Sequence, residues 1–184
     1  AQDTTEYDIR DKIVIDASSY DSQLGYCKLV FFSSDVETDS SGAVIGDAKL
    51  YRSLNGGQTW TDLGTSFGRA ELAFSEDGVL YLGTNNGLYK CTDAETRSAG
   101  NFTEAQLIQI FNQKIQDIET VHTQNDYVWW CSEKRLYRSN NKGSSYVQFY
   151  NINSDPGNCV PDNQLFRIVR VAPHNINRVM INTQ

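Results

Sequence analysis

The feature of this chain that most constrains its fold is a short motif that returns at a fixed spacing. Residues 50–60 read Leu-Tyr-Arg-Ser-Leu-Asn-Gly-Gly-Gln-Thr-Trp, and residues 136–146 read Leu-Tyr-Arg-Ser-Asn-Asn-Lys-Gly-Ser-Ser-Tyr. The two serines, Ser53 and Ser139, lie 86 positions apart, which is twice 43. A similar sequence, Leu-Tyr-Lys-Cys, occupies residues 88–91 between them. Each copy predicts a β-hairpin, because a short apolar strand leads into a turn rich in Ser, Asn and Gly.

A repeat of this length predicts one fold above others. Four-stranded blades of β-propellers typically span about 40–45 residues, and the 184 residues of the chain would hold about four of them. The ten Tyr, eight Phe and three Trp residues also suit half-buried strands. We therefore predict an all-β chain that forms a β-propeller segment of about three and a half four-stranded blades.

The repeat also predicts the internal boundaries. Residues 1–11 form a polar connector, residues 12–66 blade 1, residues 67–111 blade 2, residues 112–150 blade 3 and residues 151–184 the first half of blade 4. Because an open sheet edge is usually paired or covered, we expect another segment or another chain to supply the remaining blades, in an oligomeric assembly.

Two regions fit the repeat less well. Residues 35–47 are acidic and rich in Ser and Gly, and we expect a loop there, inserted before the third strand of blade 1. Residues 101–118 fit a helix and a strand about equally. The repeat favours a fourth strand near residues 107–111 and a new first strand near residues 115–122, and a short helix from Thr103 is the alternative.

The composition excludes some classes of function. With 16 basic and 23 acidic residues the net charge is −7, which disfavours nucleic-acid binding because that function needs concentrated Lys and Arg. No apolar run approaches the roughly 20 residues that cross a bilayer, so we predict no membrane span. Residues 1–6 lack the features of a signal peptide, so the chain either is not exported by that route or is a mature or cut fragment.

Cysteine and histidine residues give no sign of a cofactor. The four cysteines, Cys27, Cys91, Cys131 and Cys159, share no metal-ligand spacing, and we expect small buried hydrophobes, with disulfides as the alternative. His122 and His174 stand 52 residues apart without neighbouring ligands. We predict no metal and no cofactor, and we interpret the acidic loop as solvated in preference to a Ca²⁺ site.

The repeated turn resembles the Asp-box, or BNR repeat, whose pattern is Ser-x-Asp-x-Gly-x-Thr-Trp. Both copies carry Asn in place of Asp. Residues 80–90, Leu-Tyr-Leu-Gly-Thr-Asn-Asn-Gly-Leu-Tyr-Lys, are similar in style to blades of sortilin-like, photosystem-assembly-factor-like, sialidase-like and xyloglucanase-like propellers. The resemblance implies a structural turn, on the face opposite the ligand site, in which the Asn oxygen accepts backbone hydrogen bonds and the final aromatic ring packs between blades. The residues concerned are Ser53, Asn55, Gly57, Thr59 and Trp60 in the first copy and Ser139, Asn141, Gly143 and Tyr146 in the second.

The sequence gives less evidence for catalysis than for a structural turn. Residues 166–169, Phe-Arg-Ile-Val, only partly resemble the sialidase Phe-Arg-Ile-Pro motif, and no pair of carboxylates stands out for glycoside hydrolysis. Trp129 and Trp130 are adjacent, so on a strand one ring faces each side, and one of them is a candidate platform for a sugar ligand.

We expect a non-catalytic structural or binding segment of a larger assembly, such as a large secreted or cell-surface protein or a phage tail component, in an extracellular or virion location. A carbohydrate-binding or glycoside-hydrolase propeller is the alternative.

Overall fold

The computed structural model describes residues 12–121, 123–154, 164–172 and 175–183. These residues form an all-β structure with three four-stranded antiparallel sheets, a two-stranded sheet and two small hairpins. The connector 1–11, His122, Cys159 and His174 lie outside the described residues.

The four main sheets follow one another along the chain. Blade 1 contains β1 (Lys12–Ile15), β4 (Val30–Ser33), β7 (Leu50–Ser53) and β8 (Thr61–Asp62). Blade 2 contains β9 (Glu71–Phe74), β10 (Leu80–Gly83), β11 (Leu88–Cys91) and β12 (Ile108–Phe111). Blade 3 contains β13 (Asp117–Thr120), β14 (Val128–Ser132), β15 (Arg135–Ser139) and β16 (Val147–Asn151), and a half-blade contains β17 (Phe166–Ala172) and β18 (Asn175–Thr183).

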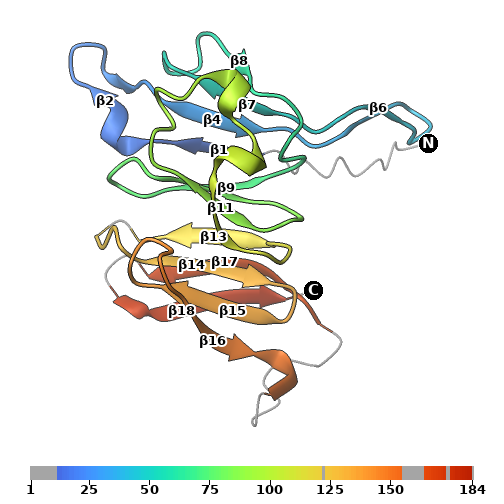
Figure 1. Cartoon of the computed structure of the whole chain (residues 1–184), viewed down its shortest axis with the longest axis vertical. Helices are drawn as coiled ribbons and strands as arrows, with labels where there is room; N and C mark the ends of the chain where they lie inside the picture. The colour runs from blue at the N-terminus through green and yellow to red at the C-terminus, as the bar shows by residue number, and fades with distance from the viewer. Residues whose placement is uncertain (1–11, 122, 155–163, 173–174, 184) are drawn as a thin grey trace, which may run out of the picture.

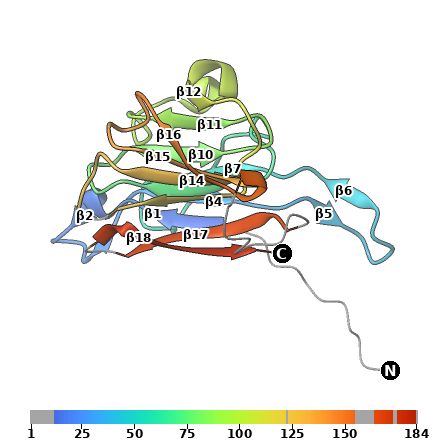
Figure 2. The ribbon, with the colours of Figure 1, turned by 90° about the horizontal axis from the view of Figure 1, so that it is seen from below.

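The sheets are stacked in sequence order, as Figure 1 shows. The first strands of consecutive sheets touch: β1 contacts β9, β9 contacts β13, and β13 contacts β17. Figure 2 shows β1 and β17 along one edge of the molecule and β12 along the opposite edge. First strands gathered at one edge, with later strands running outward, are the arrangement of blades in a β-propeller. The predicted fold class is therefore confirmed.

The strands of the middle blade are buried on both faces because a neighbouring sheet covers each face. In β10, Leu80 and Leu82 belong to the apolar cluster shared with blade 1, whereas Tyr81 belongs to the cluster shared with blade 3. Successive residues of a strand point to opposite faces, so an unbroken apolar run serves both neighbours. A third cluster joins blade 3 to the half-blade through Trp129, Phe166 and their neighbours.

The structure shows which elements form in the two regions that fit the repeat less well, residues 35–47 and 101–118. Residues 101–118 contain both of the expected features: a 3₁₀ turn, η3 (Glu104–Gln106), precedes the fourth strand β12, and β13 follows. The expectation of a plain loop at residues 35–47 was wrong in part, because β5 (Glu37–Thr38) and β6 (Val44–Gly46) form a hairpin that projects from blade 1 (Figure 1). Its turn is closed by the Asp39 carboxylate, which accepts hydrogen bonds from Ser41 and from the Ala43 N–H.

Short elements without a counterpart in the predicted repeat complete the chain. The remaining elements are η1 (Ala17–Ser19), the hairpin β2 (Tyr20–Asp21) with β3 (Tyr26–Cys27), η2 (Ala99–Asn101) and η4 (Ile152–Ser154). No helix in the described ranges is long and apolar enough to span a membrane.

The three described cysteines are unpaired. Cys27 is half-buried, and Cys91 and Cys131 are buried in strands. Burial raises the pKa of the Cys91 thiol to about 11 and that of Cys131 to about 12. Both are buried free cysteines, as the sequence predicted. The Cys91 thiol also donates a hydrogen bond to Asp93 Oδ1 at 3.3 Å.

Phe31 provides a test of packing between blades. Its ring is fully buried between blades 1 and 2, with ring centroids 5.8 Å from Phe74 and 5.5 Å from Phe102. We expect Phe31→Ala to lower the free energy of unfolding by about 3–5 kcal/mol, because it leaves a cavity in this cluster. Urea denaturation measures the loss, and Ile13→Ala, at an exposed site, serves as the control with a change of about 0.5 kcal/mol or less. Equal losses in the two variants would contradict the packing described here.

Candidate interaction site

The first repeated turn is held together by its own side chains. Ser53 Oγ accepts hydrogen bonds from the backbone N–H of Gly57 at 2.8 Å and of Asn55 at 3.3 Å, and donates to Asn55 Oδ1 at 2.9 Å. Asn55 Oδ1 also accepts from the Thr59 N–H at 2.9 Å, and Asn55 Nδ2 donates to Thr59 Oγ1 at 2.9 Å. We call residues 53–60 the first box turn.

The second box turn, residues 139–146, repeats these five hydrogen bonds atom for atom. Ser139 Oγ accepts from the N–H groups of Gly143 at 2.8 Å and Asn141 at 3.2 Å, and donates to Asn141 Oδ1 at 2.9 Å. Asn141 accepts from the Ser145 N–H and donates to Ser145 Oγ, both at 2.8 Å. In both turns the Asn side chain is a donor as well as an acceptor, which gives a physical reason for Asn at this position.

Backbone conformation distinguishes the two turns. Gly57 and Gly143 have φ of +89° and +80°, a region that residues with a Cβ avoid. The preceding position also has positive φ, and it holds Gly56 in the first turn but Lys142, at +54°, in the second. A lysine in this conformation is strained, so its side chain must offset the strain through contacts.

Lys142 makes those contacts across the interface between blades 2 and 3. Its Nζ forms an ion pair with Asp77, which lies in the turn between β9 and β10 and also accepts from Ser75 Oγ at 2.6 Å. Burial alone would raise the pKa of Asp77, but the hydrogen bonds from Lys142 and Ser75 outweigh it and hold this pKa below its ordinary value. The hydrogen bond to Asp77 raises the pKa of Lys142. The sequence motif did not reveal this tether, because Asp77 lies outside the repeat pattern.

A cluster of three aromatic rings accompanies each box turn. In blade 3 the Trp130 ring stacks on Tyr137 at 5.6 Å and meets Tyr146 edge-on at 5.4 Å. Phe111 of blade 2 contacts all three rings, at centroid distances of 4.6–5.8 Å. The box-turn aromatic Tyr146 thus packs between two blades.

Blade 1 carries the same cluster, and no blade of the described part of the chain covers it. Phe32 stacks on Tyr51 at 5.9 Å, and Trp60 meets Phe32 edge-on at 6.2 Å. Strand register places Ile13 beside Phe32, just as Ile118 lies beside Trp130 in blade 3. Ile118 is 2% exposed, whereas Ile13 is 60% exposed.

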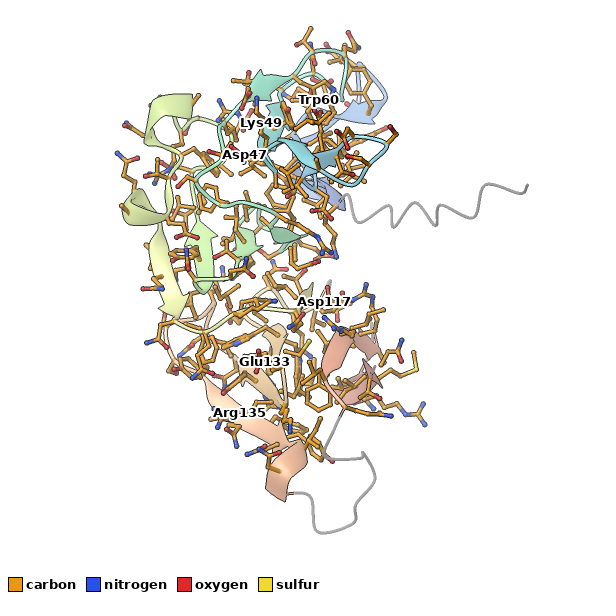
Figure 3. All side chains as sticks on the ribbon, turned by 90° about the vertical axis from the view of Figure 1, so that its right-hand side faces the viewer. Asp47, Lys49, Trp60, Asp117, Glu133 and Arg135 are labelled. Atoms are coloured by element: carbon orange, nitrogen blue, oxygen red, sulfur yellow. The ribbon has the colours of Figure 1, made fainter. Side chains whose placement is uncertain are left out.

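Ile13, Ile15, Phe32, Tyr51 and Trp60 together form what we call the open face of blade 1. Trp60 lies at the end of the stack, far from Asp117 (Figure 3). Its exposed fraction, 41%, is close to the 43% of Tyr146, so the exposed side chains of Ile13 and Ile15 are what mark this face as open. An apolar face of this kind marks an interaction surface more often than a solvated one.

Cations on the third strands tie consecutive blades together. Arg52 of β7 donates from Nη1 to three backbone carbonyls that follow β11 in blade 2, those of Ala94 at 2.9 Å, Glu95 at 3.3 Å and Arg97 at 2.6 Å. Lys90 of β11 donates from Nζ to the carbonyl of Lys142, in the box turn of blade 3, at 3.0 Å. In both cases a third-strand cation binds the turn after the third strand of the next blade.

The tryptophan platform proposed from the sequence requires correction. Trp129 and Trp130 are both 0% exposed. They do face opposite sides of β14, but Trp130 packs in the cluster with blade 2 and Trp129 in the cluster with the half-blade. The reason is that sheets cover both faces of β14, so neither ring can stack on a sugar.

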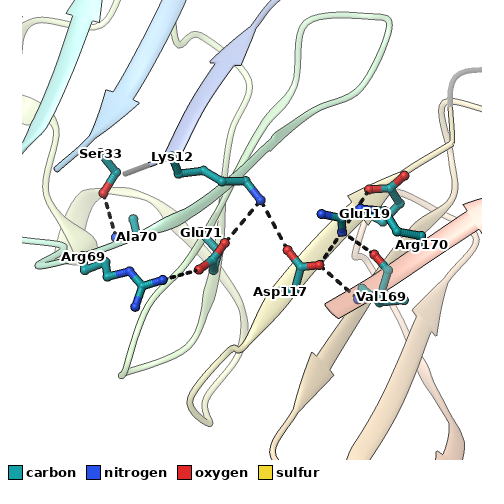
Figure 4. A network of polar contacts seen from close by, with 9 residues as sticks. All are labelled: Lys12, Ser33, Arg69, Ala70, Glu71, Asp117, Glu119, Val169 and Arg170. Atoms are coloured by element: carbon teal, nitrogen blue, oxygen red, sulfur yellow. Dashed lines mark hydrogen bonds and ion pairs between the residues drawn. The ribbon is translucent and has the colours of Figure 1, made fainter. Parts of the chain in front are cut away.

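A charged network links the first strands of all four sheets (Figure 4). Lys12 Nζ lies 3.3 Å from Glu71 Oε2 and 3.4 Å from Asp117 Oδ1, so it bridges blades 2 and 3 from blade 1. Asp117 is almost fully buried, and its Oδ2 accepts from the Val169 N–H at 3.0 Å and pairs with Arg170. Burial alone would lower the pKa of Arg170, but the carboxylates of Asp117, Glu119 and Glu71 together raise it.

The repeat pattern missed this network, although a signal was present. Lys12, Glu71 and Asp117 are each the first residue of the first strand in their sheet. Opposite charges alternate along the network, so the arrangement neutralises itself and serves to join blades. In the described ranges, no group of three or more His, Cys, Asp or Glu side chains could hold a metal ion.

Comparisons with known proteins do not assign the chain to a family. No family model and no curated protein matches the chain. Among solved structures, the chain is similar to YCF48 from Cyanidioschyzon merolae, a β-propeller protein, with 15% sequence identity and a TM-score of 0.47. The match covers 81% of this chain and 47% of that one, so the chain spans about half the length of that structure. The assignment of the fold rests on the sheets described above.

The box turn predicts a hierarchy among substitutions of Asn141. Asn141→Ala removes three side-chain hydrogen bonds and should lower the free energy of unfolding by about 1–3 kcal/mol. Asn141→Asp keeps the acceptor oxygen, and the Ser145 hydroxyl can rotate to donate, so we expect a loss of about 1 kcal/mol or less. Urea denaturation compares both with Asn140→Ala, a change at the exposed neighbour. An Asp variant as unstable as the Ala variant would contradict the geometry.

The Asp77–Lys142 pair predicts a pH dependence. Because the pKa of Asp77 is lowered in the folded chain, the pair stabilises the fold above about pH 4, and its contribution is lost as the pH falls through the lowered value. Asp77→Asn should therefore destabilise the chain most at neutral pH, by about 1 kcal/mol or less for a pair this exposed. The difference from wild type should shrink toward about pH 3, as urea denaturation at stepped pH would show. In a Lys142→Met background, the effect of Asp77→Asn on stability should depend less on pH. An unchanged pH dependence would show that the Asp77–Lys142 pair is not its source.

Proposed function

We propose that this chain is a non-catalytic, structural or binding segment of a β-propeller that functions inside a larger assembly. The observation that supports the proposal most is the open face of blade 1. It carries the same ring cluster that blade 3 uses to receive Phe111 of blade 2. A surface built for packing against another blade, and left exposed, is suited to association.

The polar residues support the same function. In both box turns the Ser and Asn side chains form hydrogen bonds within the turn. Four side chains bridge one blade to the next: Arg52, Lys90, Asp77 and Asp117. These groups contribute rigidity between blades, which a scaffold or a binding module requires.

The partner and the location follow from the same reasoning. We propose further blades, from the same or another chain, as the partner of the open face. The resemblance of the box turns to the Asp-box favours a large secreted or cell-surface protein, or a virion component, as the host. With Trp129 and Trp130 buried, no described feature favours the carbohydrate-binding alternative.

Association of the purified chain tests the proposal. Replacing Ile13 and Ile15 by Ser on the open face should reduce self-association, which sedimentation velocity measures over a range of concentrations. The same change should reduce the binding of an apolar fluorescent dye. Both residues are more than half exposed, so the fold should lose little stability.

Val44→Ser with Ile45→Ser is the matched control, because these residues are equally exposed but lie on the projecting β5–β6 hairpin. We expect the control to associate like the wild type. A wild-type chain that stays monomeric at every concentration, with equal dye binding in both double variants, would overturn the proposal.

A further inference from the structure

Three cations occupy one equivalent position in the three complete blades. Arg52, Lys90 and Arg138 each follow Leu-Tyr on the third strand. Each lies opposite a fully buried aromatic residue of the second strand, and these partners are, in the same order, Phe31, Tyr81 and Trp129. The three side chains therefore face the same way, each toward the following sheet.

The first two cations have matching acceptors, and the third has none among the described residues. Arg52 and Lys90 donate to carbonyls in the turn after the third strand of the next blade. Arg138 makes no hydrogen bond to the described part of the chain. Its Cζ lies over three rings instead, 5.4 Å from the centroids of Trp129 and Phe149 and 5.7 Å from that of Tyr127.

The neighbouring outer strand shows the same difference. Ile110 of β12 lies at the irregularity in the pairing of β11 with β12, and Phe149 of β16 lies at the same place in blade 3. Ile110 packs so close to the box turn of blade 3 that a Cβ on Gly143 would lie 2.4 Å from its Cδ1. Phe149 is 49% exposed. Arg138 and Phe149 thus form a pair whose counterparts in blade 2, Lys90 and Ile110, both contact a box turn.

We infer that Arg138 and Phe149 form a docking site for the glycine turn of a β-hairpin supplied by another polypeptide segment. A carbonyl at the position of Lys142 would accept the Arg138 hydrogen bond, and a glycine at the position of Gly143 would leave room for the Phe149 ring. The hairpin would pack beside the β17–β18 half-blade. The inference rests on the proposed function, and it specifies one partner of the chain as a hairpin turn that contains a glycine and a free carbonyl group.

A hairpin taken from the chain itself serves as the probe. A synthetic peptide of residues 48–63, cyclised through its ends, contains the first box turn with its Gly56 carbonyl and Gly57. We expect the peptide to bind the full chain saturably. Calorimetry and the NMR signal of the Arg138 Nε–H measure this binding. The same peptide with Gly57→Val should not bind, because valine disfavours a φ near +89°.

Variants of the chain assign the binding to Arg138. Arg138→Ala should weaken it at least about tenfold, the effect of losing one charge-assisted hydrogen bond. Arg138→Lys should retain it within about threefold, because Lys90 performs the same contact with an ammonium group. Lys114→Ala, which removes an exposed positive charge elsewhere, should bind like the wild type, and circular dichroism confirms that each variant is folded.

Two outcomes would overturn the inference. One is a folded wild-type chain that shows no saturable binding, or that binds equally well with Ala at position 138. The other is a dimer that depends on Arg138 and that the peptide cannot displace, since the surface that contacts Arg138 would then not be a box turn. The Ile13 and Ile15 variants should bind the peptide normally, so failure here is distinguishable from failure of the proposed function.

Discussion

Packing between sheets is the constraint on which the rest of this structure depends. A four-stranded sheet of apolar residues has two faces to bury, and blade 2 buries both because a sheet lies on each side of it. Burial of about 25 cal/mol per Å² on each face is the main source of stability available to such a stack. The terminal sheets cannot satisfy the same requirement within the described chain. The contrast between Ile118 and Ile13, at equivalent positions, follows from this alone.

Apolar packing does not fix the spacing between sheets, and polar contacts supply that precision. The charged network joins the first strands at one edge. Away from that edge, Arg52 and Lys90 on third strands join blades 1 and 2 to a turn of the following blade. The box turns provide backbone carbonyls in a fixed conformation because five internal hydrogen bonds hold them. The third-strand cations link neighbouring blades only, as expected of a repeat array in which every unit contacts the next. Lys12 of blade 1 also reaches Asp117 of blade 3, because the first strands gather at one edge.

The sequence predicted the features that the repeated motif carries and missed several that lie outside it. The 43-residue period was enough to predict four-stranded sheets, and the box motif located both turns. The Asp39 turn inside the acidic insertion and the Lys142–Asp77 tether have no counterpart in other repeats, so no pattern could indicate them. The burial of both Trp129 and Trp130 was missed for another reason. Alternation along a strand shows that two rings face opposite ways, but only the stack shows that both faces are covered.

The exposed contacts at the two ends of the stack are of opposite kinds. Blade 1 presents a box turn and a ring cluster, which are the groups that accept an outer strand and a cation in the contact between blades 2 and 3. Blade 3 presents Arg138 and Phe149, which are the groups that supply the cation and the outer strand. A contact made from two different halves is heterologous, so it gives assembly a direction and disfavours symmetric pairing of one face with itself. Any partner that docks on blade 1 must therefore supply the groups that blade 3 presents, and a partner of blade 3 must supply a turn.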